Sequence, residues 1–459
     1  MIADSYLVYK TIKNQNMNSL RNLIVPLFSV AVLILPFNSC SDSSGVLITG
    51  EEKAWHTITF TFDGPSAAEY DTVNPFTDYR FEIEFTDGQK KITAPGYFAS
   101  DGDAAETSAR SGNKWRAHFC PPSAGTWTYR AIFLKGKGVA VSAGQAVGER
   151  CFFDGTTGTI TVGETDKQAP DFRAKGRLQY YGDRYLRYSG TGEPFLKGGA
   201  DSPENFLGYK DFDGTYFGGI SKTRDGEAAP NRSLHSYGPH IADWKTGDPE
   251  WKNGKGRGII GALNYLSSKG MNSVYFLTLN ILGDGEDVWP YTDRNERYRF
   301  DCSKLDQWEI VFDHMDSLGM MIHFVLQETE NECLLDNGYT DVQRKLYLRE
   351  LVARFGHHLA VTWNIGEENG PADWTPIGQT DAQKKAMMSY LKQINPYPSI
   401  VVLHTHADNG HQDLYLNPLL GFENLDGPSL QIGDPAWINN RVFKWVGESG
   451  KAGKRWSKR

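Results

Sequence analysis

Apolar and polar residues alternate with a period of two from residue 55 to about residue 162. Residues 55–62, 79–85, 114–119 and 126–133 are clear examples, and Gly, Asp and Pro separate them. Such alternation is typical of strands that bury one face. Asp87 and Gly88 together form a typical hairpin turn. We therefore predict an antiparallel β-sandwich over residues 54–164.

A second pattern follows a polar, Pro-containing linker at residues 165–176. Short apolar runs at 195–201, 273–280, 321–327, 359–366, 400–404 and 429–433 alternate with helical patterns at 259–266, 308–318, 347–355, 382–393 and 438–446. Alternating strands and helices predict parallel strands with right-handed crossovers. We predict an α/β TIM barrel over residues 177–459, with six of eight βα units present and the C-terminal part incomplete.

Two further features refine this prediction. Residues 178–188 contain two short strand-like runs around Gly182, which we expect to form a hairpin that closes the bottom of the barrel. A doubly wound sheet is the alternative fold, but no GxGxxG motif follows a strand.

The first 53 residues carry a predicted export signal. Arg21 precedes an apolar run at 23–35, which is too short to span a membrane comfortably. Ser39 and Cys40 resemble a bacterial lipoprotein cleavage site, where the cysteine is lipidated. We predict a signal peptide at 1–40 and a flexible tether at 41–53. The mature chain would be a lipoprotein of the outer membrane or cell surface or, after ordinary cleavage, periplasmic or secreted.

Composition excludes some partners. A net charge of -8 without a basic stripe argues against nucleic acid, and membrane contact is expected only through the lipid anchor. The 12 Trp and 22 Tyr suit either sugar-binding platforms or an aromatic core. Export would permit disulfides among Cys120, Cys151, Cys302 and Cys333. No CxxC or His-rich spacing predicts a metal, and we expect no cofactor.

Polar residues gather where the predicted barrel strands end, which is where barrel enzymes carry their active sites. Taken alone, each could be a helix cap or a structural histidine. Together they predict a functional cleft. The long loop at 206–257 is rich in aromatic residues, which we expect to form a sugar-groove wall. The candidate cleft residues are Asp201, Glu204, Asn280, Gln327, Glu328, Trp363, Glu367, Glu368, His404, His406 and Asp408.

Residues 363–369 read Trp-Asn-Ile-Gly-Glu-Glu-Asn. They resemble the strand-four signature Trp-x-x-Gly-Asn-Glu-Pro of retaining glycoside hydrolases of clan A. Residues 74–98, 115–119, 124–129, 195–205 and 404–408 resemble exported proteins that join an immunoglobulin-like sandwich to such a barrel. The resemblance implies that Glu368 is the general acid/base. Glu367 stands where the family has the Asn that contacts the sugar 2-hydroxyl.

A retaining mechanism also needs a carboxylate nucleophile about 5 Å from the acid. Adjacent residues of a strand point to opposite faces, so Glu367 and Glu368 are not expected to be that pair. The clan's nucleophile follows strand seven, and we expect it to be absent from this chain, which we interpret as a fragment. The sequence thus predicts a glycoside hydrolase for polysaccharides or oligosaccharides, inactive if the nucleophile is missing. The alternative is a non-catalytic glycan-binding surface lipoprotein. An adhesive module is a third reading, which no sequence feature demands.

Overall fold

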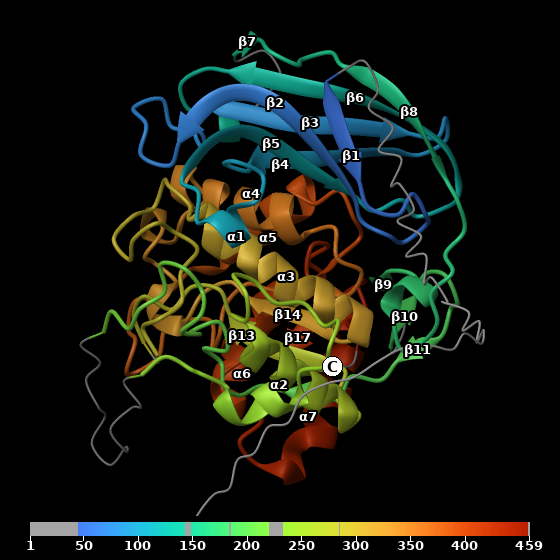
Figure 1. Cartoon of the computed structure of the whole chain (residues 1–459). Coiled ribbons are helices and arrows are strands. Elements are labelled where there is room, and N and C mark those ends of the chain that lie inside the picture. Colours follow the sequence, from blue (N-terminus) through green and yellow to red (C-terminus); the bar gives the residue numbers. More distant parts are fainter. Residues whose placement is uncertain (1–44, 143–147, 183–184, 220–232, 284, 458–459) are drawn as a thin grey trace, which may run out of the picture. The chain divides into compact units, whose positions relative to one another are not determined.

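The structure is a computed structural model that describes residues 45–142, 148–182, 185–219, 233–283 and 285–457 (Figure 1). The predicted signal peptide, Cys40 and the start of the tether lie outside these residues. All described residues belong to one unit, residues 39–459. Within the described ranges, every helix is too short or too polar to cross a bilayer. The four cysteines in this part of the chain are free thiols.

The N-terminal strands are antiparallel, as predicted. They are β1 (Val46–Thr49), β2 (Ile58–Ala68), β3 (Tyr79–Thr86), β4 (Lys91–Phe98), β5 (Ser111–Phe119), β6 (Gly125–Lys135), β7 (Glu149–Arg150) and β8 (Thr157–Val162). Their order is β1-β2-β5-β4-β3-β6-β7, with β8 also paired to β6. Phe60 on β2 and Phe85 on β3 have ring centroids 5.1 Å apart although two strands separate them in this order. The sheet therefore folds over on itself around an aromatic core.

Strand β4 joins the two layers. Its first part, up to Pro95, pairs with β3, and its last part, from Gly96, pairs with β5. A strand that changes partner in this way makes a corner between packed sheets. A side chain at Gly96 would meet the Phe81 ring at 2.1 Å, so the corner requires glycine.

The second set of strands begins with a small antiparallel sheet of β9 (Leu178–Gln179), β10 (Leu186–Tyr188) and β11 (Pro194–Phe195). Leu178 and Leu186 pack in one buried cluster with Met321, Leu359 and Ile400, which lie at the amino ends of the parallel strands. The Leu178 N–H also donates to the Leu359 carbonyl at 2.8 Å. The hairpin thus covers the bottom of the parallel sheet, as predicted.

The parallel sheet contains β12 (Gly199–Ala200), β13 (Ser273–Leu277), β14 (Met321–Val325), β15 (Val361–Asn364), β16 (Ile400–His404) and β17 (Gly427–Ser429). These six strands follow each other in chain order. A doubly wound sheet would reverse its order at a switch point, so that alternative is wrong. The helices are α2 (Arg257–Ser268), α3 (Cys302–Leu318), α4 (Val342–Phe355), α5 (Asp381–Ile394), α6 (Asn409–Leu416) and α7 (Ile438–Lys451). In the described ranges β12 and β17 are edge strands, so the sheet is barrel-like without closing.

Several predicted elements differ from the structure. The run at 195–201 is divided between β11 and β12, because Phe195 pairs in the antiparallel hairpin. The sixth strand lies at Gly427–Ser429 instead of 429–433, and α6 was not predicted. The expected sugar-groove wall is wrong for Tyr209, Phe212 and Trp251. These three rings are buried and pack on one another, with Phe212 and Trp251 stacked at 5.4 Å.

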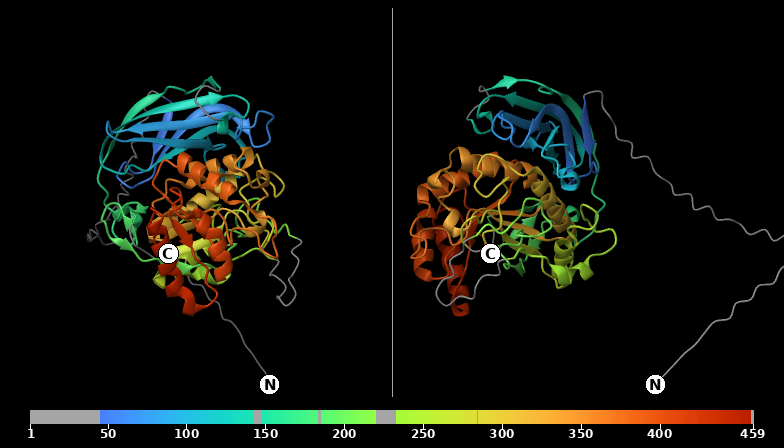
Figure 2. Two further views of the ribbon diagram at one scale, coloured as in Figure 1. Left: turned by 180° about the vertical axis from the view of Figure 1, so that it is seen from behind. Right: turned by 60° about the vertical axis from the view of Figure 1, so that its left-hand side comes forward.

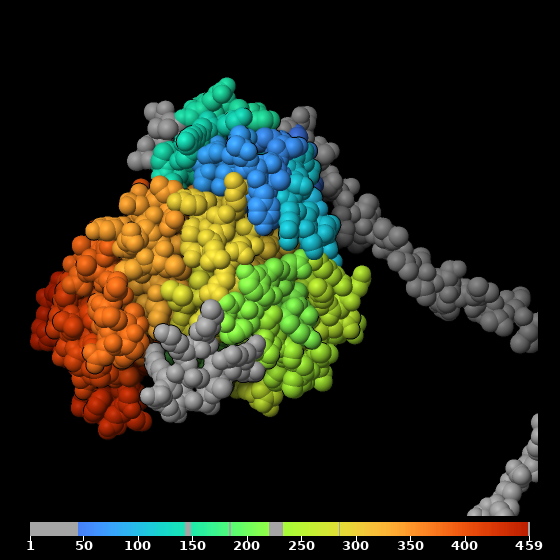
Figure 3. Space-filling view, turned by 90° about the vertical axis from the view of Figure 1, so that its left-hand side faces the viewer, coloured from blue at the N-terminus to red at the C-terminus, as the bar shows by residue number. Residues whose placement is uncertain are grey.

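The sandwich rests on α3 and α4 (Figures 1 and 2), and its surface lies directly against these yellow and orange residues in Figure 3. Arg354 of α4 lies at this junction with its side chain 2% exposed. Its guanidinium donates to Asp306 and Glu350 at 2.7 Å and to the carbonyl of Phe98 at 3.1 Å. It also lies 4.1 Å from the centre of the Tyr97 ring. One buried cation therefore joins two helices to the end of β4.

Arg354→Met should lower the free energy of unfolding by about 3–5 kcal/mol, because it leaves two buried carboxylates without their cation. Urea unfolding followed by circular dichroism measures this change. Lys451→Ala is the control, since Lys451 pairs with Glu448 on the surface with its side chain 76% exposed. Equal stability losses in both variants would contradict the importance of the buried network.

Candidate functional site

Three carboxyl groups converge at the carboxyl ends of the parallel strands. Glu204 follows β12, Glu328 follows β14 and Glu367 follows β15. One oxygen from each lies within 4.8 Å of the others. Glu328 and Glu367 are only 5% and 7% exposed, while Glu204 is partly exposed. We call these three residues the carboxylate cluster.

The cluster holds at least one proton. Burial raises the pKa of Glu328 well above its usual value, and the charge of Glu367 and a side-chain hydrogen bond between the two groups raise it further. Two buried carboxylates in contact cannot both ionise readily, so the pair shares a proton. Glu328 and Glu367 can therefore offer both a hydrogen-bond donor and an acceptor.

Tyr275 adds a neutral hydroxyl to this group. It lies on β13, is 4% exposed, and its hydroxyl has no hydrogen-bond partner in the described ranges. Burial raises the pKa of its phenol well above the usual value, and the charge of Glu367 adds to this. Because the phenol stays protonated, it is a donor beside the carboxylates. Sequence analysis missed Tyr275, since an aromatic residue inside an apolar strand gives no signal of its own.

Glu368 lies in a separate environment from Glu367. Its φ is +35°, a backbone conformation that non-glycine residues adopt at a cost. Its N–H donates to His404 Nδ1 at 3.0 Å, and its Oε2 lies 3.9 Å from His406 Nδ1. We predicted that strand alternation would separate the two acids, but β15 already ends at Asn364. That reason is wrong, and the turn at Glu368 is the feature that separates them.

The two histidines beside Glu368 are neutral. Burial lowers the pKa of His404 to about 3 and that of His406 to about 4. His406 Nε2 lies 3.3 Å from the carbonyl of Gly370, which can only accept, so this nitrogen carries the hydrogen. The other nitrogen, Nδ1, therefore presents its lone pair toward the Glu368 carboxyl. Trp374, which sequence analysis also missed, is 44% exposed and packs edge-on against His406 at 5.6 Å.

Other candidate residues have structural contacts. Gln327 is fully buried and bonded to Arg344 and Gln379 through both ends of its amide. Trp363 is also fully buried, stacks on the ring of Phe324 at 5.0 Å and is a core residue. A sugar cannot reach either side chain without displacing the core.

The remaining three candidates lie at the rim. Asn280 is buried and its side-chain oxygen accepts from the N–H groups of Asp287 and Val288, which fixes the turn after β13. Asp408 caps α6 and pairs with His411 at 2.6 Å. Asp201 is exposed and outside the carboxylate cluster. The structure thus assembles Glu204, Glu328 and Glu367, with Glu368, His404 and His406 as a second group.

Comparison with solved structures shows that the chain has a glycoside-hydrolase-like fold. Residues 51–134 match the family described as "Domain of unknown function (DUF5060)". A structure from Bacteroides vulgatus ATCC 8482, provisionally named a glycoside hydrolase, has a TM-score of 0.52 and 16% identity over 85% of this chain. This chain covers 62% of that protein. The likeness concerns the fold alone.

More distant structural neighbours carry related names. The endo-1,4-β-mannanase of Rhizomucor miehei has a TM-score of 0.39 and 12% identity, covering 61% of this chain and 80% of the mannanase. A family 5 glycoside hydrolase from Bacteroides vulgatus has a TM-score of 0.35 and 13% identity, covering 63% of this chain and 64% of its own. The comparison with curated protein sequences finds no match.

The shared proton predicts a pH dependence of stability. Folded Glu328 binds its proton more tightly than unfolded Glu328, whose pKa is near 4.5. Its contribution to the free energy of unfolding therefore falls as the pH rises above 4.5, by at most about 1.4 kcal/mol per pH unit. Glu328→Gln should remove this part of the slope between about pH 5 and 8, measured by urea unfolding at each pH.

The control for this experiment is Asp201→Asn, an exposed carboxylate near the same rim. Glu332 contributes a slope of the same sign, since burial raises its pKa to about 7. The contribution of Glu328 is therefore read from the difference between the variant and the natural protein in the slope of unfolding free energy against pH. An unchanged slope in Glu328→Gln would show that Glu328 is ionised in the folded protein.

Proposed function

We propose that this protein is a glycoside hydrolase that acts on a polysaccharide or oligosaccharide. The observation that carries the proposal is that Glu368, on its strained turn beside two neutral histidines, and a proton-sharing carboxylate cluster both lie at the carboxyl ends of the strands. Glycoside hydrolysis needs a carboxylic acid that donates a proton to the leaving oxygen. The glycoside-hydrolase-like fold supports this reaction class.

Glu368 is the proposed general acid/base. Glu328 and Glu367 contact each other, so no scissile bond fits between them and they are poorly suited to be an acid and nucleophile pair. Because they share a proton, they can instead bind sugar hydroxyls, which both donate and accept hydrogen bonds. Tyr275 would donate a further hydrogen bond to the same ring.

A retaining mechanism is part of the proposal and rests on the family resemblance. It requires a nucleophilic carboxylate about 5 Å from the acid. We assign this role to none of the described residues. We also propose that the protein is exported and carries a lipid on Cys40, which would place the cleft outside the cytoplasm, at the outer membrane or cell surface or in the periplasm.

Glu368→Gln should lower the rate of hydrolysis by about 10²–10⁴-fold, the usual contribution of a general acid/base. The assay is reducing-sugar release from a panel of polysaccharides. Asp373→Asn is the matched control, because Asp373 is an exposed carboxylate in the same loop. If both variants hydrolyse every substrate as fast as the natural protein, the assignment of Glu368 is wrong.

A non-catalytic glycan-binding protein is the second candidate. The observation that favours it is the exposed Trp374 beside His406, because aromatic faces bind sugar rings without any chemistry. In this case affinity electrophoresis should show retention by a polysaccharide without product release. Glu368→Gln would leave that retention unchanged, whereas Trp374→Ala should weaken it by about threefold to tenfold, as expected for the loss of one ring contact.

A further inference from the structure

A second cluster of ionisable residues lies at the opposite edge of the parallel sheet from the cleft. Glu309 and Asp313 are one turn apart on α3, and His357 and His358 lie between α4 and β15. One ligand-type atom from each lies within 4.8 Å of all the others. The two histidines are buried, Glu309 is partly buried and Asp313 is exposed. None of these residues takes part in the proposed hydrolysis.

Both imidazoles face the same carboxylate. His357 Nε2 lies 3.0 Å from Glu309 Oε1, and His358 Nε2 lies 3.2 Å from Glu309 Oε2. Tetrahedral zinc with bonds of 2.0–2.1 Å separates its nitrogen and oxygen ligands by about 3.3 Å. The spacing of these three groups is therefore close to that of a bound zinc ion.

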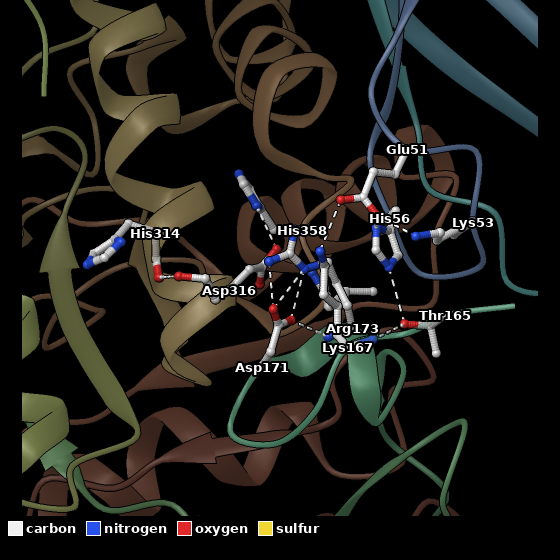
Figure 4. A network of polar contacts seen from close by, with 12 residues as sticks. Glu51, Lys53, His56, Thr165, Lys167, Asp171, Arg173, His314, Asp316 and His358 are labelled. Atoms are coloured by element: carbon white, nitrogen blue, oxygen red, sulfur yellow. Dashed lines mark hydrogen bonds and ion pairs between the residues drawn. The ribbon is translucent and has the colours of Figure 1, made fainter. Parts of the chain in front are cut away.

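The hydrogen bonds of His358 indicate which nitrogen could bind a metal. His358 Nδ1 lies 2.9 Å from Asp316 Oδ2, and Figure 4 shows the two side chains directed toward each other. An ionised carboxylate only accepts, so Nδ1 carries the hydrogen, and in a neutral ring Nε2 presents a lone pair to Glu309. Two acceptors at this distance need a positive charge between them, either a second ring proton or a metal. A carboxylate on the distal nitrogen is the usual support of a metal-binding histidine.

His357 is an independent observation for a ligand. It is 2% exposed, its Nε2 faces Glu309 Oε1 at 3.0 Å, and its Nδ1 has no hydrogen-bond partner in the described ranges. Buried imidazole nitrogens are rarely left in that state. The ring packs at 4.4 Å on His118 of the sandwich, which prevents it from turning freely.

The backbone of the two histidines is held in place. The Arg177 guanidinium donates to the carbonyl of His358 at 2.5 Å and to that of His357 at 2.7 Å. Arg173, which lies close by in Figure 4, is engaged by Asp171 through both carboxylate oxygens. Arg177 therefore fixes the backbone of both histidines through their carbonyl groups.

We propose that Glu309, Asp313, His357 and His358 form a structural zinc site. Two neutral imidazoles and two carboxylates supply a charge of −2, which balances a divalent ion, and imidazole with carboxylate is a donor set that zinc accepts. Exposed Asp313 provides the route of entry. The bound ion would hold α3 to the segment that leads into β15, directly below the sandwich.

A nearby cluster offers a matched comparison. Glu51, His56 and Asp166 also come within 4.8 Å of one another. Lys53 bonds Asp166 and Glu51, and Lys167 bonds Glu51. Ammonium groups therefore already supply the positive charge beside Glu51, which Figure 4 shows near Lys53. This cluster should not bind zinc.

The test uses the full chain, freed of metal with a chelator and titrated with zinc chloride in a calorimeter, with metal content measured after dialysis. We expect one zinc ion per chain at this site and a higher melting temperature with zinc. Glu309→Gln and Asp313→Asn should each weaken this binding more than tenfold, while Asp166→Asn should not. Asp313 is exposed, so its variant should fold even if the Glu309 variant does not, and circular dichroism checks both.

Cobalt substitution gives a second readout, because the visible spectrum of tetrahedral cobalt should disappear in Asp313→Asn. The absence of zinc binding by the natural protein would overturn the proposal and leave a protonated ion-pair network in its place. Zinc binding that survives both ligand substitutions would also overturn it, since the ion would then lie elsewhere. Neither result bears on hydrolysis, which Glu368→Gln tests separately.

Discussion

The parallel register of the sheet is the constraint on which the site depends. Phe276, Phe324 and Trp363 stand side by side on β13, β14 and β15. Four residues further along the chain, just after each strand ends, come Asn280, Glu328 and Glu367. The hydrogen bonds that align three apolar residues therefore also align three polar ones at the carboxyl edge. A slip of one residue between β14 and β15 would separate the two carboxylates that share a proton.

Long, regular features of the fold could be predicted from the sequence. Five-residue runs with four apolar residues, as at 321–325 and 400–404, are long enough to indicate a strand, and both form strands. Strands β12 and β17 have only two and three residues, which is too short for any periodicity. These two strands are defined by their hydrogen bonds to β13 and β16. Such bonds depend on tertiary contacts, which a local sequence pattern does not show.

The candidate site was predictable in position but not in detail. Strand ends drew attention to Glu204, Glu328 and Glu367, which the structure brings close together. The same argument also selected Gln327 and Trp363, because a local pattern does not show whether a side chain turns toward solvent or toward the core. The high content of aromatic residues was compatible with either sugar binding or core packing, and in the structure most Trp residues pack in the core. Eight of the 12 Trp are fully buried: Trp115, Trp127, Trp251, Trp289, Trp308, Trp363, Trp445 and Trp456.

Strand β4 has a mechanical consequence. Because it pairs with β3 at its start and with β5 at its end, neither layer of the sandwich can peel away without breaking the strand's bonds to the other. Its last residue, Phe98, is bonded through its carbonyl to Arg354 on α4, the helix that leads into β15. A tensile load applied to either layer would thus pass along one continuous path to β15, the strand that precedes Glu367 and Glu368. Force on the sandwich would therefore be transmitted through Arg354 to the parallel sheet.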